Sequence, residues 1–507
     1  MKLPSGRAAG IFYFMLPLIV SAFTYFWNSA NYPLGPSNDE GIYIRRAMHV
    51  LSGFGPQESL LYDHPYFSQI FMAVVFSIIN YPNVLNPTVD SVESIKMIFF
   101  VPRTIMATIA LVDTALVYMI SKYWYKSRTI AITASTLFAV MPFADPIRRV
   151  LLESIQLPFF LSSILFAICA TKKINTTNSN GISARQILFV VISGTFLGLA
   201  IFTKIPIFTM IPLIVFIIYK SNKIKRVLAL WILPVIIVPS FWPLYALYKN
   251  QLNLWFNGIY FQTHRGVQTF FEIIKYHFQY DPILVTLGLI GIAFSTIKKD
   301  LFILIWTVPF FVFLYAVGFV SYWHIVPLIP LFCIAAARLI YDLSQLIPKK
   351  NIQKILPFLL LFIISFYSIH TYTEVIMASN NSTHFELVAF IVKYLYDDTH
   401  IETNNKDKIV LISNPFYSWI PKYAFNLNNY QAVDYLDNVS VNANKVLMIL
   451  DSQWENRAKN NMLGAKMVEN YKTYGKNKIA TFGENVTNNQ AVSIYAFDSN
   501  NRKTPTS

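Results

Sequence analysis

The sequence predicts a polytopic α-helical membrane protein with a small α/β domain at its C-terminal end. Hydrophobic residues make up 55% of the 507 residues and charged residues only 13%, which is more apolar than soluble domains usually are. Apolar runs of about 17 to 22 residues recur between residues 10 and 373, and a helix of that length can span a bilayer. After residue 375 the sequence becomes more polar and rich in Asn, which is typical of a soluble domain.

The apolar runs predict about eleven membrane helices. No small-residue cleavage site follows the first run, so we interpret it as an anchor rather than a signal peptide that is removed. The run YFSQIFMAVVFSIIN (66–80) is short for a span and is interpreted as an interfacial or re-entrant helix that does not cross. The predicted spans lie near residues 10–27, 103–121, 129–144, 154–170, 186–203, 205–219, 227–247, 281–297, 300–318, 324–343 and 354–373.

Basic residues in the short loops predict the orientation of these helices. Lys and Arg are enriched in short cytoplasmic loops. With the predicted spans, all the basic loops fall on the side of the N-terminus, which is therefore expected to be cytoplasmic. The net charge of +15 thus indicates membrane topology and does not indicate nucleic-acid binding. The basic segments are Lys2 and Arg7, 122–128, 172–185, 220–226, 298–300 and 348–354.

Residues 375–507 are expected to form an extracytoplasmic α/β domain that follows a membrane domain of residues 1–374. Strand-like runs (KIVLIS, KVLMIL and VSIYAF) alternate with helix-like runs (HFELVAFIVKYLYDD and WENRAKNNMLGAKMVENY). Asn-x-Ser/Thr patterns give weak support for an outside location, because a further pattern at Asn175 falls in a predicted inner loop. The patterns in the C-terminal domain are at Asn380, Asn381, Asn438 and Asn485.

The predicted topology brings carboxylates and cations from distant segments to the outer face of the membrane. A carboxylate there can act as a general base on a hydroxyl or amine, and nearby cations can bind a phosphate and stabilise it as it leaves. With apolar helices to accept a lipid tail, these parts favour group transfer from a lipid phosphate. The candidates are the acids Asp39, Glu40 and Glu153, the cations Arg103, Arg149 and Lys204, and the polar residues His64, His264, Arg265, Tyr322 and His324.

Several of these residues also have structural interpretations. Ser37 followed by Glu40 fits a helix capping box. Arg149 and Glu153 fit an ion pair one helical turn apart. Lys204 could extend toward lipid phosphates at the membrane surface.

Aromatic and histidine residues near the outer face need not be functional either. Tyr322 and His324 could belong to the aromatic belt at the membrane interface, and His64 could be an ordinary loop residue. Asp113 lies in the middle of a predicted span, where a carboxyl group is costly and is usually buried against a partner. The sequence does not identify that partner. Cys169 and Cys333 both lie in predicted spans and form no disulfide framework.

A series of segments within roughly residues 10–340 occurs in a characteristic order: NDEGIYIRRA, DHPYFSQ, VPRTIMATIALVDTALVYMISKYWYKSR, RRVLLESIQLPFFLSSI, GLAIFTKIPIFTMIPL and YWHIVPLIPLFCIAAA. This series resembles the glycosyltransferase C superfamily, specifically the branch of protein O-mannosyltransferases and aminoarabinose transferases. The chain departs from the family patterns in places. His-Pro-Pro reads His64-Pro65-Tyr66, Arg-Leu-Pro reads Val101-Pro102-Arg103, and Glu153 stands where many relatives have Asp.

The resemblance implies a function, and it implies roles for the acidic and basic candidates. It implies a membrane glycosyltransferase that moves a sugar from a polyprenyl-phosphate donor to a protein, glycan or lipid acceptor on the outer face. Asp39 would be the catalytic base and Glu40 its companion, while Glu153 would be a second acidic site residue. Arg103, Arg149 and Lys204 would contact the donor phosphate. Some relatives hold a divalent cation, for which Asp39, Glu40, His64 and Glu153 could supply ligands.

Two other functions are compatible with a polytopic chain. A transporter or lipid flippase would place ionisable groups and Gly or Pro breaks near the bilayer midplane, whereas the polar groups here are predicted at one surface and Gly totals only 17. A scaffold without catalytic activity would use the outer α/β domain to bind a partner. The sequence favours the transferase over both.

Overall fold

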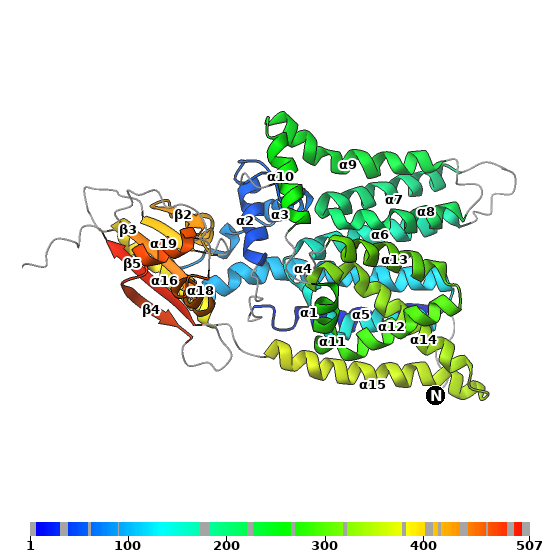
Figure 1. The fold of residues 1–507 in the computed structure, drawn as a ribbon. Coiled ribbons are helices and arrows are strands. Elements are labelled where there is room, and N and C mark those ends of the chain that lie inside the picture. Colours follow the sequence, from blue (N-terminus) through cyan, green and yellow to red (C-terminus); the bar gives the residue numbers. More distant parts are fainter. Residues whose placement is uncertain are drawn as a thin grey trace, which may run out of the picture. The chain divides into compact units, whose positions relative to one another are not determined.

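The chain forms two compact units in the computed structural model (Figure 1). The helical unit comprises Met1–Trp27, Gly55–Ile70 and Thr104–Val375, and the sheet unit comprises Asn28–Phe54, Phe71–Arg103 and Ile376–Ser507. The predicted division at residue 374 stays a prediction. The structure describes residues 7–30, 39–58, 62–89, 91–172, 183–220, 227–264, 269–317, 322–377, 382–400, 409–413, 417–434, 445–462, 465–483 and 491–498.

The helical unit is built almost entirely from apolar helices. Helix α6 packs on α7 and α7 on α9, while α12 packs on α14, α14 on α5 and α5 on α1. The elements are α1 (Arg7–Phe26), α5 (Arg128–Val140), η2 (Pro142–Arg148), α6 (Leu152–Thr171), α7 (Ala184–Thr203), η3 (Ile205–Met210), α8 (Ile211–Tyr219), α9 (Leu228–Tyr248), α10 (Leu252–Thr263), α11 (Phe270–Tyr280), α12 (Pro282–Ile297), α13 (Leu301–Val317), η5 (Tyr322–Leu328) and α14 (Ile329–Gln345).

Helices α3 (Phe67–Ile78), α4 (Val92–Tyr125) and α15 (Lys350–Met377) contribute residues to both units. Helix α4 has 34 residues, so it is about 51 Å long, whereas the hydrocarbon core of a bilayer is about 30 Å thick. The predicted span 103–121 is therefore only part of this helix. Its first turns extend beyond the span and belong to the sheet unit.

The apolar helices agree with the predicted polytopic membrane fold. Among the described residues, six helices are long and apolar enough to cross a membrane by themselves. Helices α12 and α13 pass the same test only as a pair, which is bent by 119°. The remaining predicted spans correspond to shorter apolar helices. These are Gly10–Phe26 within α1, Arg128–Val140 (α5) and Ile205–Tyr219. Helix α3 has 12 residues, which is too short to cross alone, as expected for 66–80.

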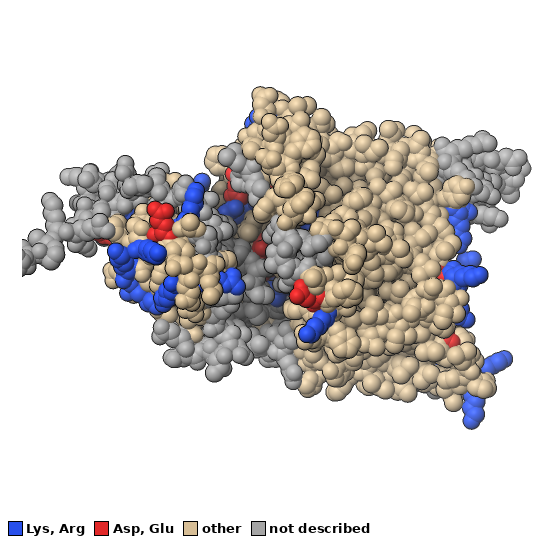
Figure 2. Space-filling view, in the orientation of Figure 1, with Lys and Arg blue, Asp and Glu red and all other residues tan. Residues whose placement is uncertain are grey.

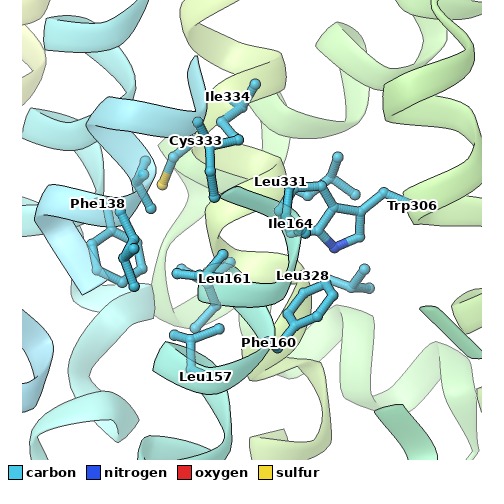
Figure 3. Close-up of a cluster of buried hydrophobic side chains, with 14 of the residues drawn as sticks. Phe138, Leu157, Phe160, Leu161, Ile164, Trp306, Leu328, Leu331, Cys333 and Ile334 are labelled. Carbon is cyan, nitrogen blue, oxygen red and sulfur yellow. The ribbon is translucent and has the colours of Figure 1, made fainter. Parts of the chain in front are cut away.

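Large apolar side chains form the core of the helical unit, and Figure 3 shows the part of it to which α5, α6, α13, η5 and α14 contribute. Phe138 of α5, Phe160 of α6 and Trp306 of α13 are all fully buried, and the Phe160 and Trp306 rings meet edge to face at 5.3 Å. Leu331 and Ile334 of α14 belong to the same cluster. Burial of this kind fixes the helices that carry the candidate site residues.

Basic side chains gather at one end of the helical unit, while its flank is largely uncharged (Figure 2). The last three residues of α4 each lie under a cation from a different segment. Lys172 lies over the ring of Tyr123, Lys220 over Trp124 and Arg338 over Tyr125. These three cations thus lie at the same end of α4, which agrees with the predicted topology; that this side is cytoplasmic stays a prediction.

The sheet unit contains a five-stranded mixed sheet, as expected for an α/β domain. The strand order is β2-β1-β3-β5-β4, in which β1 pairs in parallel with β2 and β3, and β5 pairs antiparallel with β3 and β4. The elements are α2 (Asp39–Leu51), η1 (Asn83–Leu85), α16 (Ser382–His400), β1 (Ile409–Ser413), α17 (Ile420–Phe425), β2 (Tyr430–Asp434), β3 (Lys445–Asp451), α18 (Ser452–Lys459), α19 (Ala465–Tyr474), β4 (Lys478–Phe482) and β5 (Val492–Asp498).

The sequence predicted three of these strands, and it predicted one helix where the structure has two. Runs in β1, β3 and β5 are buried and apolar, whereas β4 is a partly exposed edge strand without a strong apolar pattern. The run predicted as one helix, 454–471, forms α18 and α19. Asn461 has a φ of 54°, a left-handed conformation that interrupts an α-helix.

Asp113 of α4 is completely buried, as its position in a span predicted. Neither of its carboxylate oxygens has a hydrogen-bond partner within the described part of the chain. The partner that the sequence left open is therefore not identified by the structure.

Candidate functional site

An apolar cavity of about 250 Å³ in the helical unit contains several of the predicted site residues. Its walls come from the loop before α3, the turn between α7 and η3, helices α9, α10 and α13, and the segment η5. Lys204, His64 and His324 reach this cavity together with Asp63, which the sequence argument did not single out. The other lining residues are Pro65, Ile205, Pro206, Phe208, Trp242, Ile259, Gln262, Thr263, Phe313, Leu314 and Val317.

Lys204 is held in the cavity wall by a buried ion pair. It ends α7 in an extended conformation, and Pro206 follows in the first turn of η3. Its ammonium group contacts the carboxylate of Glu153 in the first turn of α6, and the two residues are 5% and 2% exposed. Gln156 donates hydrogen bonds to the carbonyl oxygens of Ala200 (2.9 Å) and Lys204 (2.6 Å). The turn is therefore fixed both by charge and by backbone hydrogen bonds.

This pairing decides between the alternatives for Lys204 and Glu153. A buried ammonium group paired with a carboxylate is not a side chain that extends to lipid headgroups. The helical ion pair between Arg149 and Glu153 does not form on one helix, because α6 begins at Leu152 and Arg149 is extended. Lys204 instead places one paired cation beside an otherwise mostly apolar cavity.

The loop that carries Asp63 and His64 is fastened to α9 and α10. Tyr62 donates a hydrogen bond of 2.6 Å to Gln251, and Tyr66 donates one of 2.9 Å to Gln57. Burial raises the pKa of the phenols of both Tyr62 and Tyr66, so both stay protonated and can donate these bonds. A Cβ atom on Gly258 of α10 would overlap the carbonyl group of Tyr62. Only glycine allows this close approach.

A second buried ion pair joins Glu40 and Arg103 within the sheet unit. The guanidinium group donates two hydrogen bonds to the carboxylate, from Nε to Oε1 (3.1 Å) and from Nη2 to Oε2 (2.7 Å). It donates a third to the carbonyl oxygen of Ser29 (3.2 Å). Both side chains are 2% exposed. The Glu40 carboxylate therefore acts as a binding partner of Arg103; Ser37, the expected capping residue, lies outside the described residues.

No family profile and no curated protein matches the sequence, but solved structures do. ArnT from Cupriavidus metallidurans in the apo state aligns over 98% of this chain and 99% of its own, with a TM-score of 0.61 and 11% identity. The same protein bound to undecaprenyl phosphate aligns over 97% and 98%, with a TM-score of 0.58 and 12% identity.

The oligosaccharyltransferase AglB from Archaeoglobus fulgidus is similar as well. Its complex with an inhibitory peptide and a dolichol-phosphate aligns over 94% of this chain and 73% of that chain, with a TM-score of 0.56 and 12% identity. The chain has the glycosyltransferase C fold. The fold that the ordered segments led us to expect is therefore confirmed.

Within the glycosyltransferase C fold, the remaining candidates do not gather in the described cavity. Asp39 lies half-buried in the first turn of α2, and Arg149 is half-buried between η2 and α6. His264 is exposed, and its ring stacks on Tyr260 of the same helix at 4.0 Å. Arg265 and the side chain of Tyr322 lie outside the described residues.

Several cavity residues could not be found from sequence. Asp63 had one available signal, its position next to His64 in the segment DHPYFSQ. Gln262 and Thr263 also had one signal, their position directly before His264 in the segment YFQTHRG. Trp242 had none, and the packing of α9 and α10 brings it to the cavity.

A divalent cation stays a prediction. Within the described residues, no group of three or more His, Cys, Asp or Glu side chains is arranged to hold a metal ion. Two of the four proposed ligands, Glu40 and Glu153, are each bound to a basic side chain instead.

Proposed function

We propose that this protein is an integral-membrane glycosyltransferase that uses a sugar linked to a lipid phosphate. The observation that carries the proposal is the position of Lys204, a buried cation in the wall of an apolar cavity. A lipid phosphate has the matching chemistry, with one anionic group joined to an apolar chain. The fold supports this proposal, because similar structures of ArnT and AglB contain undecaprenyl phosphate and dolichol-phosphate.

The donor phosphate binds next to Lys204 in this proposal. The ammonium group supplies the positive charge, and the imidazoles of His64 and His324 supply hydrogen bonds. Glu153 orients Lys204 toward the cavity. Phe208, Leu314 and the other apolar lining residues accept the first part of the lipid chain.

Asp39 is the proposed general base of the transfer. Its carboxylate takes the proton from a hydroxyl or amine of the acceptor as the acceptor atom attacks the anomeric carbon. The bond between that carbon and the phosphate oxygen breaks, and the lipid phosphate leaves with the bonding electrons. Lys204 stabilises the charge that develops on the phosphate. The acceptor is a protein, glycan or lipid on the outer face.

A transfer assay tests this proposal. Purified protein in nanodiscs is incubated with a polyprenyl-phosphate hexose and candidate acceptors, and release of polyprenyl phosphate is measured. Lys204→Ala should abolish binding of polyprenyl phosphate, whereas Lys249→Ala, an exposed cation at the end of α9, should bind it normally. If Lys204→Ala bound polyprenyl phosphate as well as Lys249→Ala does, Lys204 would not be part of the phosphate site. Absence of both transfer and donor hydrolysis in the wild type would contradict the function.

A single substitution distinguishes two roles of Asp39, that of a general base and that of a residue that only starts the helix. Asn is also favoured at helix starts but cannot accept a proton at neutral pH. Asp39→Asn should therefore bind the donor normally and lose transfer by about a hundredfold or more. Transfer at the wild-type rate would show that another carboxylate is the base.

The proposed location is the cell membrane, with the N-terminus in the cytoplasm and the sheet outside. Leu346, at the end that carries the basic loops, and Met462 of the sheet unit are 76% and 72% exposed. Cysteines introduced at these positions should react with a membrane-impermeant maleimide from opposite sides of the membrane. Labelling of both from one side would contradict the topology.

A further inference from the structure

Helix α2, which begins with Asp39 and Glu40, is connected at its start to helix α17 of the sheet unit. Glu40 binds Arg103 through two hydrogen bonds. The Arg103 guanidinium lies over the ring of Phe99, 5.7 Å from its centroid. The Phe99 ring in turn meets the ring of Trp419 at 6.2 Å, and Trp419 is the N-cap residue of α17.

These connecting side chains are all buried. Glu40, Arg103, Phe99 and Trp419 are each no more than 2% exposed. Phe385 of α16 is also fully buried, and its ring lies 5.8 Å from that of Phe99. Because close-packed interiors deform little, a displacement of Trp419 would be transmitted to Glu40.

The part of α4 that carries Phe99 and Arg103 is also fixed locally. Pro102 has no backbone N–H, so the carbonyl group of Ile98 loses its usual helical donor. The hydroxyl group of Tyr81 donates to this carbonyl oxygen instead, at 2.8 Å. Tyr81 is 1% exposed. The helix therefore keeps its backbone hydrogen bonding satisfied in the turn that presents Arg103 to Glu40.

The C-terminal end of α2 is also connected to α17. Phe54 follows α2, and its backbone N–H donates to the carbonyl oxygen of His49 in the last turn (3.3 Å). The rings of His49 and Phe54 lie 5.3 Å apart. The ammonium group of Lys422 in α17 lies over the Phe54 ring, 5.5 Å from its centroid. Trp419 and Lys422 thus connect one short helix to both ends of α2.

We propose that α17 and the sheet that carries it position the acidic start of α2 for catalysis. Arg103, Phe99 and Trp419 are positioning residues, and Arg103 acts through Glu40 rather than on the donor phosphate. The sheet unit then positions Asp39 and Glu40 and is more than an appended domain. The link to catalysis rests on the proposed function, whereas the positioning of α2 by α17 does not.

The experiment compares two tryptophans of the sheet unit in the full-length protein in nanodiscs. Trp419→Ala removes the contact with Phe99, and Trp454→Ala of α18 is the matched control. Amide hydrogen exchange is measured over α2, β1 and β3, together with polyprenyl-phosphate binding and transfer kinetics. In Trp419→Ala, exchange in α2 should rise about tenfold while β1 and β3 stay protected. Trp454→Ala should leave α2 unchanged.

The kinetic arm distinguishes positioning from general destabilisation. Trp419→Ala should lower kcat by about tenfold to a hundredfold, as expected when a catalytic group is misplaced, with donor KM unchanged. Trp419→Phe, which keeps an aromatic contact, should restore most of both readouts. If the wild type transfers no sugar, the proposed function fails, and the exchange arm still decides the positioning.

A second variant covers the case in which Trp419→Ala unfolds the sheet, which would appear as exchange in β1 and β3. Phe99→Leu keeps an apolar side chain in α4 and removes only the aromatic link. It should raise α2 exchange and lower kcat in the same way. The deciding result comes from whichever variant, Trp419→Ala or Phe99→Leu, keeps β1 and β3 protected. If its α2 exchange and its kcat both equal those of the wild type, the proposal is overturned.

Discussion

The two buried ion pairs of this protein have similar burial and different surroundings. In the helical unit, Lys204 and Glu153 lie in the wall of a cavity, and Lys204 itself lines it. In the sheet unit, Arg103 is surrounded by the Glu40 carboxylate, the Ser29 carbonyl oxygen and the Phe99 ring. A cation beside a cavity can bind an anion without losing its partner. A cation enclosed by its own partners serves to hold them.

The same residue types therefore perform different tasks because of what lies next to them. Lysine is a compact point charge that suits the cavity wall, whereas the planar guanidinium of Arg103 matches the carboxylate with two hydrogen bonds and stacks on an aromatic ring. The family resemblance implied that both cations contact the donor phosphate. We propose that Lys204 has that role and that Arg103 has a positioning role.

The largest expected effect comes from removing the cation of each pair. Lys204→Ala and Arg103→Ala each remove the basic partner of a buried carboxylate, which should cost about 3–5 kcal/mol of stability. Polyprenyl-phosphate binding should be lost only in Lys204→Ala, and hydrogen exchange in α2 should rise only in Arg103→Ala. Titration of folded, purified variants with polyprenyl phosphate measures the first difference. The reverse pattern would mean that the two roles are exchanged.

Acid should destabilise the sheet unit through His384. Burial lowers the pKa of this imidazole from its usual 6.5 to about 4, and the ring stacks on Tyr417 at 5.9 Å. Between these two pH values the unfolded chain binds a proton that the folded unit does not, so stability falls as pH decreases from about 6.5 to about 4, by up to about 3 kcal/mol.

Hydrogen exchange of β1 and β3 at several pH values measures this loss. His384→Phe keeps an aromatic ring against Tyr417 and cannot titrate, so its exchange should depend less on pH over that interval. An identical pH dependence in wild type and His384→Phe would exclude His384 as the cause.

A smaller effect is expected at the cavity from Gly258→Ala. The added methyl group must displace the backbone of Tyr62, next to Asp63 and His64, at a cost of about 1–3 kcal/mol. Transfer should decrease more than stability does, because the displaced loop lines the cavity. Gly10→Ala in α1 is the control, since its Cβ would lie at an ordinary 3.9 Å from Arg128. Equal transfer by both variants would show that the loop position is unimportant.

The smallest expected effect comes from replacing the acidic residue of each ion pair, Glu153 or Glu40. Glu153→Gln keeps a hydrogen-bond acceptor beside Lys204 and removes the opposing charge, so polyprenyl-phosphate affinity should rise by roughly threefold to tenfold. Glu40→Gln should leave this affinity unchanged, because Arg103 does not line the cavity. Equilibrium binding of polyprenyl phosphate at constant salt is the measurement. A lower affinity in Glu153→Gln would mean that orientation of Lys204 matters more than its net charge.

The sequence by itself determined the fold class and identified several of the residues that line the cavity. Apolar runs of the length of a bilayer dictate helices that satisfy their own backbone hydrogen bonds. The runs in β1, β3 and β5 are apolar enough to require a sheet interior. His64, Lys204 and His324 could be grouped because the predicted spans bring their segments to one membrane face.

Only the tertiary structure decided which of these residues meet. Topology places a residue at a membrane face, but a side-chain contact depends on how helices rotate and pack. The spacing of Arg149 and Glu153 fits a helical ion pair as one of two interpretations, but the packing of α6 on α7 pairs Glu153 with Lys204. Residues 28–54 and 71–103 belong to the sheet unit, because the buried Phe99 packs on side chains more than 280 residues away in sequence. No local pattern encodes such a contact, since it results from packing between distant segments.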